Sequence, residues 1–125
     1  MENEKITESI KKLESFLEGL PNVKVVDDCY GEQYLNYLNI WIQCNDFYTI
    51  SVIARAFSKN YISTENRWFV SLNSNDVKTS PQFGLLIHLI EKPKNEESVI
   101  NDIEKILINL KYWSQNEFKE YFSNE

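Results

Sequence analysis

The chain has 125 residues and carries 19 acidic side chains against 13 basic ones, a net charge of −6. Hydrophobic residues make up 42% of it and aromatic residues 14%, which predicts a single folded domain over residues 1–125 and excludes a disordered chain. The acidic charge disfavours nonspecific binding to nucleic acid, whose phosphates it repels, and favours a basic protein partner.

The cysteines and the first residues bear on the compartment. Only Cys29 and Cys44 are present, too few for a disulfide framework in a domain of this size. The chain starts MENEKITESI, which is polar where a signal peptide would be apolar, and no apolar run approaches the length of a membrane span. We therefore expect a cytoplasmic protein with reduced thiols and no membrane partner.

The first predicted element is an amphipathic helix near the N-terminus. Gly19 and Pro21 predict its end, because glycine accepts the left-handed cap conformation and proline cannot continue a helix. The apolar residues recur at three- and four-residue steps, which places them on one side of a helix. They are Ile6, Ile10, Leu13, Phe16, Leu17 and Leu20.

Five strands are predicted to follow this helix, at residues 23–26, 38–44, 48–57, 68–72 and 83–90. Apolar and polar residues alternate in the second, third and fourth, which is typical of strands with one buried side. The fifth is apolar almost throughout, which indicates a strand covered on both faces.

The second and third of these strands are expected to pair as a β-hairpin. A three-residue loop at 45–47 aligns Ile42 with Ile50 and Ile40 with Val52, so that apolar residues meet across the pair. A two-residue loop would align apolar with polar residues, and we therefore predict the longer loop or an equivalent bulge.

A long helix is predicted at the C-terminal end, with Asn95 as its cap. Residues 114–117, SQNE, have the form of a capping box, which indicates a second helix starting there. The predicted fold class is α+β: an antiparallel sheet of about five strands with the N-terminal and C-terminal helices packed on one face. The apolar positions of the long helix are Val99, Ile103, Ile106, Leu110 and Trp113.

The second face of the predicted hairpin supplies the candidate binding residues. Trp41 and Arg55 would project from it, and Phe69 would continue it on the next strand. Aromatic side chains and arginine are enriched at the centres of protein interfaces, whereas solvated sheet faces usually carry more charge. A protein partner on this face is the functional hypothesis. The alternatives are that a loop, the C-terminal segment or a second copy of the chain covers the face.

No pattern in the sequence indicates catalysis or a cofactor. His88 is the single histidine and lies in an apolar strand, FGLLIHLI, where no Ser, Cys or Asp is near in sequence to serve as its partner. Neither a P-loop nor a GxGxxG motif occurs. We expect a protein that is not an enzyme and binds no cofactor.

An acidic segment follows the first strand. Asp27 and Asp28 precede Cys29, and Glu32 follows it, but one thiol among carboxylates is a poor match to zinc or calcium ligand patterns. The segment is interpreted as a turn closing the first strand, with no metal. Its three carboxylates are the second candidate for contact with a basic partner.

The small size, the acidic charge and the helix–strands–helix order together give a chain that resembles bacterial immunity proteins, including those that neutralise contact-dependent growth inhibition toxins. The resemblance covers the whole chain and implies inhibitory binding to a cognate toxin domain, often a nuclease with a basic cleft. Two other classes stay open. One is a dimeric secretion or assembly chaperone, and the other is a small enzyme or ligand-binding domain with a pocket between sheet and helices.

Overall fold

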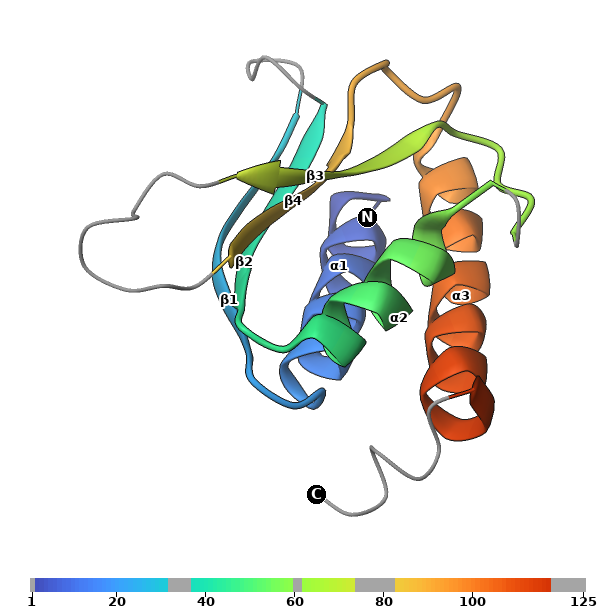
Figure 1. Ribbon diagram of the computed structural model, residues 1–125. Coiled ribbons are helices and arrows are strands. Elements are labelled where there is room, and N and C mark those ends of the chain that lie inside the picture. The colour runs from blue at the N-terminus through green and yellow to red at the C-terminus, as the bar shows by residue number, and fades with distance from the viewer. Residues whose placement is uncertain (1, 32–36, 60–61, 74–82, 118–125) are drawn as a thin grey trace.

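The computed structural model describes residues 2–31, 37–59, 62–73 and 83–117 (Figure 1). Over these residues the fold is α+β, with three α-helices and one four-stranded antiparallel sheet. In chain order the elements are α1 (Glu2–Glu18), β1 (Val23–Tyr30), β2 (Leu38–Cys44), α2 (Phe47–Phe57), β3 (Trp68–Asn73), β4 (Phe83–Leu89), α3 (Glu96–Tyr112) and the π-helical turn η1 (Trp113–Glu117).

The strands are ordered β1-β2-β4-β3, and the three helices lie on one side of the sheet (Figure 1). The two central strands supply the core, because their alternate residues point at the helices and Ile40 pairs directly with Ile87. These helix-facing residues are at most 2% exposed: Leu38, Ile40, Ile42, Leu85, Ile87 and Leu89.

The first and last helices form where the apolar spacing predicts them. Asn95 caps α3, since its side-chain oxygen accepts a hydrogen bond from the backbone nitrogen of Ser98 at 2.9 Å. At residues 114–117 the chain runs from α3 straight into η1, and the Ser114 hydroxyl donates to the Lys111 carbonyl at 3.2 Å. The rest of the helix predicted to start there lies outside the described residues.

The predicted hairpin is wrong, and with it the count of about five strands. Residues 48–57 belong to α2, and β2 pairs with β1 and β4. The segment alternates like a strand, yet its apolar residues also recur at helical spacing, and period alone cannot decide between the two. The buried residues of α2 are Thr49, Val52, Ile53, Ala56 and Phe57.

Asp46 decides the conformation of this segment by capping α2. One of its carboxylate oxygens accepts hydrogen bonds from the backbone nitrogens of Tyr48 at 3.0 Å and Thr49 at 3.3 Å. The second oxygen accepts from the Asn22 side chain at 3.3 Å. Two amides that a helix start leaves unsatisfied are thereby paired, and Asp46 is itself buried.

We expect Asp46→Ala to lower the free energy of unfolding by about 1–2 kcal/mol, the usual cost of removing a capping carboxylate. Asp46→Ser should retain most of the stability, because a hydroxyl can accept the same bond. Urea denaturation followed by circular dichroism measures both. The control is Asn45→Ala at the exposed neighbouring position, and equal losses in Asp46→Ala and this control would contradict the capping role.

The first strand is longer than predicted and contains a β-bulge. Val25 pairs with Ile42 and Asp27 pairs with Trp41, so Val26 is an extra residue and is 52% exposed. The bulge breaks the apolar alternation, which is why the pattern indicates a shorter strand.

Candidate functional site

One side of the sheet carries no helix in the part of the chain that the structure describes (Figure 1). We call it the helix-free face. Cross-strand pairing arranges its residues in rows, because paired residues of neighbouring strands point to the same side. The rows are Cys29, Asn39, His88 and Phe69, then Asp27, Trp41, Leu86 and Ser71, and then Lys24, Gln43 and Gly84.

Of the three residues predicted to project from the hairpin face, Trp41 and Phe69 share the helix-free face. Trp41 and Phe69 are both half-buried, and they lie in adjacent rows of the sheet. Leu86 lies beside Trp41 on β4 and is half-buried too, so Trp41 and Leu86 occupy the two central strands of the face and Phe69 lies next to them on the edge strand β3. That arrangement has the composition of an interface centre.

Arg55 is not on this face, and its predicted position is wrong. It belongs to α2 on the opposite side of the sheet, and its guanidinium carbon lies 5.0 Å from the centre of the Trp113 ring. Arg55 lies away from the predicted face because its segment forms α2 instead of the second strand of the hairpin. Arg67 instead lies close to the helix-free face, with its guanidinium carbon 5.6 Å from the centre of the Phe69 ring.

His88 lies on the helix-free face and is 9% exposed. Its Nε2 is 3.2 Å from the Ser71 hydroxyl, and its ring centre is 5.5 Å from that of Phe69. A serine therefore does reach the histidine, from a strand that is distant in sequence. Nδ1 of His88 has no hydrogen-bond partner among the described residues, so no carboxylate orients the ring as a catalytic base requires.

Burial lowers the pKa of His88 below its ordinary value. The ring is therefore neutral near pH 7, and one of its nitrogens accepts or donates the bond to Ser71 according to the tautomer. This geometry gives a hydrogen-bonded pair within the sheet surface.

The acidic residues of the predicted turn are separated in the structure. Asp27 and Asp28 lie within β1 rather than in a turn, and they point to opposite sides of the sheet. Asp27 joins the helix-free face beside Trp41, whereas Asp28 lies on the side of the helices. Glu32 lies outside the described residues. Among those residues no group of three or more His, Cys, Asp or Glu side chains is placed to hold a metal ion.

Asp28 interacts with the carboxyl group of Glu14 on α1. Burial first, and then the hydrogen bond and the charge of Asp28, raise the pKa of Glu14 from 4.5 to about 8. The folded protein therefore keeps a proton on Glu14 that the unfolded chain releases near pH 4.5. Stability conferred by that proton is present below pH 4.5 and is lost as the pH rises toward 8.

We expect Glu14→Gln to stabilise the protein at pH 9 and to change little at pH 5, because the amide is neutral at both. The gain at pH 9 should be on the order of 1–2 kcal/mol, since partial solvent exposure reduces what the pKa shift implies. Thermal melting at the two pH values measures it. Glu4→Gln, at an exposed site on the same helix, is the control, and an equal gain at both pH values would contradict the raised pKa of Glu14.

Asp102 is a buried polar residue that sequence reasoning missed. It is fully buried on α3, and its two carboxylate oxygens accept four hydrogen bonds from residues 65–68. The donors are the backbone nitrogens of Glu65 and Asn66 at 2.7 and 3.0 Å, the Asn66 amide at 2.9 Å and the Trp68 indole nitrogen at 3.0 Å. A carboxylate satisfied in this way fixes the entry to β3 against α3 and has a structural role.

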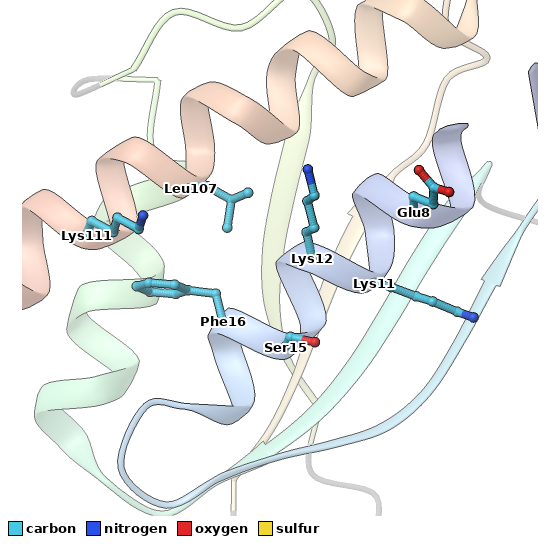
Figure 2. A pocket seen from close by; sticks show the side chains of 7 residues that line it. All are labelled: Glu8, Lys11, Lys12, Ser15, Phe16, Leu107 and Lys111. Atoms are coloured by element: carbon cyan, nitrogen blue, oxygen red, sulfur yellow. The ribbon is translucent and has the colours of Figure 1, made fainter. Parts of the chain in front are cut away.

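A groove of about 630 Å³ lies between α1 and α3 (Figure 2). Phe16 and Leu107 form its apolar floor, and its other lining residues are polar or charged. Sequence reasoning did not find it, because its two walls are far apart in the chain. The polar lining consists of Glu8, Lys11, Lys12, Ser15 and Lys111.

The chain matches no protein-family model, no curated protein and no solved structure. None of the helices within the described residues is long and apolar enough to cross a membrane. The geometry of its surfaces is therefore the basis for assigning a function.

Proposed function

We propose that this chain is a non-enzymatic binding protein that contacts a protein partner through the helix-free face. The observation that carries the proposal is the pairing of Trp41 with Leu86, next to Phe69, in the middle of that face. Half-buried aromatic side chains flanked by small polar ones form the kind of surface on which a partner can exclude water from a few strong contacts.

The charge of the chain indicates what kind of partner fits. A protein with a net charge of −6 attracts a basic surface and speeds its approach. Asp27 lies directly beside Trp41 in the register, so one carboxylate adjoins the apolar centre where such a partner would dock. A basic toxin domain, such as a nuclease with a cationic cleft, satisfies both requirements.

We therefore assign the protein to the immunity type: an inhibitor that neutralises a cognate bacterial toxin by direct binding. The described cysteines, Cys29 and Cys44, are both free thiols, which is consistent with action in the cytoplasm. In this role the protein needs no cofactor and no metal ion, because inhibition by occupying a cleft requires only affinity.

The test is co-expression with the polypeptide encoded by the neighbouring reading frame of the source genome. We expect that polypeptide to arrest growth alone, and the pair to restore growth and to elute as a stable complex. Association should slow as salt is added, since electrostatic steering is screened. Continued growth arrest with no complex would refute the assignment. A dimer of this chain that blocks the helix-free face would favour the chaperone-like alternative.

A further inference from the structure

The groove between α1 and α3 lies on the helical side of the sheet, away from the helix-free face (Figures 1 and 2). Its floor is apolar because Phe16 and Leu107 pack against the core from the two helices but remain partly exposed. A volume of about 630 Å³ falls in the range of small-molecule sites. Space and an apolar lining are therefore present for a ligand.

Positive charge gathers at the rim of this groove. Lys12 from α1 and Lys111 from α3 stand on either side of Leu107, and Phe16 extends beneath Lys111, whereas Lys11 points away (Figure 2). The concentration of lysine is unusual for a chain in which acidic residues outnumber basic ones by 19 to 13. Two ammonium groups above an apolar floor favour a ligand with an anionic head and an apolar body.

Glu8 limits the charge that this head can carry. It lines the same groove, so the two facing lysines and Glu8 leave a net charge of about one positive unit. A singly charged carboxylate neutralises that net charge, whereas a dianionic phosphate would leave the groove with an excess negative charge beside Glu8. The apolar floor is formed by side chains and offers no polar partner, which suits a hydrocarbon chain.

We propose that the groove between α1 and α3 binds a small amphipathic carboxylate, with its hydrocarbon body on Phe16 and Leu107 and its carboxylate between Lys12 and Lys111. The site is separate from the helix-free face, so it does not depend on the proposed partner. A variant that no longer binds the carboxylate can still be tested for partner binding, and a variant that no longer binds the partner can still be tested for carboxylate binding.

Isothermal titration calorimetry of the purified protein with laurate, below its micelle concentration and at low salt, tests the proposal. We expect saturable binding that the double variant Lys12→Glu/Lys111→Glu weakens roughly tenfold or more, the effect of reversing two partly exposed charges next to the head group. Dodecanol should bind more weakly because it lacks the charge, and acetate should not bind because it lacks the body.

The matched control is Lys24→Glu/Lys94→Glu, which changes the net charge by the same amount at two exposed lysines outside the groove. We expect it to bind laurate nearly as the unmodified protein does. Equal weakening in both double variants would assign the effect to net charge and overturn the site. Equal affinity for dodecanol and laurate, or no saturation by laurate, would overturn it as well.

Discussion

Asp102→Ala is expected to lower the free energy of unfolding by about 3–5 kcal/mol, the cost of breaking a buried, hydrogen-bonded carboxylate site. The substitution leaves four nitrogen donors without their acceptor, all of them on residues 65–68. Among these donors the Trp68 indole is buried and has least access to water as a replacement. Urea denaturation monitored by tryptophan fluorescence measures the loss.

Two further variants separate the hydrogen-bond network from the general effect of a helix substitution. Glu104→Ala lies at an exposed position of the same helix and should change stability by less than about 0.5 kcal/mol. Asp102→Asn should lower the free energy of unfolding by less than Asp102→Ala and by more than Glu104→Ala. Its amide oxygen still accepts a hydrogen bond, whereas its amide nitrogen faces other donors. A loss in Asp102→Ala no larger than that in Glu104→Ala would show that the network contributes nothing.

The helical stripes of α1 and α3 could be predicted because their periodicity has a single interpretation. Ile6, Ile10 and Leu13 fit only one face of a helix, and all three are buried. The second strand of the predicted hairpin was wrong because the apolar residues of segment 48–57 fit both the strand period and the helix period. A local hydrogen bond from Asp46 resolves the ambiguity, and the Asp that precedes this segment was the available signal.

The candidate site could be predicted only where it depended on strand alternation. Trp41 and Phe69 lie opposite the buried residues of their own strands, so their common face follows from period 2. The position of Arg55 was predicted wrongly because it lies on α2, a segment that was predicted to be a strand. Asp102 was detectable as a polar residue within the apolar stripe of α3, but its four donors come from the loop before β3 and from Trp68 at the start of β3, and the sequence does not determine the path of that loop.

The groove between α1 and α3 could not have been predicted from any local sequence pattern. Lys12 and Lys111 lie on the first and last helices, and only the packing of α1 against α3 brings them to one groove. On either helix alone each is an ordinary solvated lysine. The register of helix packing depends on side chains along the whole contact, which no short sequence window contains.

Trp41→Ala is expected to weaken binding of the proposed partner by roughly thirtyfold or more, because truncating an aromatic anchor at an interface centre typically costs about 2 kcal/mol or more. The fold should survive. Trp41 is half-buried on the side of the sheet opposite the main core, and its cross-strand contact with Leu86 is worth about 1 kcal/mol at most. Titration of each protein against the partner, with a melting curve for each, measures both quantities.

Phe47→Ala provides the matched control for this prediction. Phe47 is also aromatic and is 76% exposed, but it begins α2 on the helical side of the sheet and does not belong to the helix-free face. Its replacement should leave affinity unchanged, whereas Asp27→Asn, next to Trp41, should mainly slow association at low salt. If Trp41→Ala unfolds the protein, Trp41 belongs to the core. If Trp41→Ala and Phe47→Ala bind with equal affinity, the helix-free face is not the surface that contacts the partner.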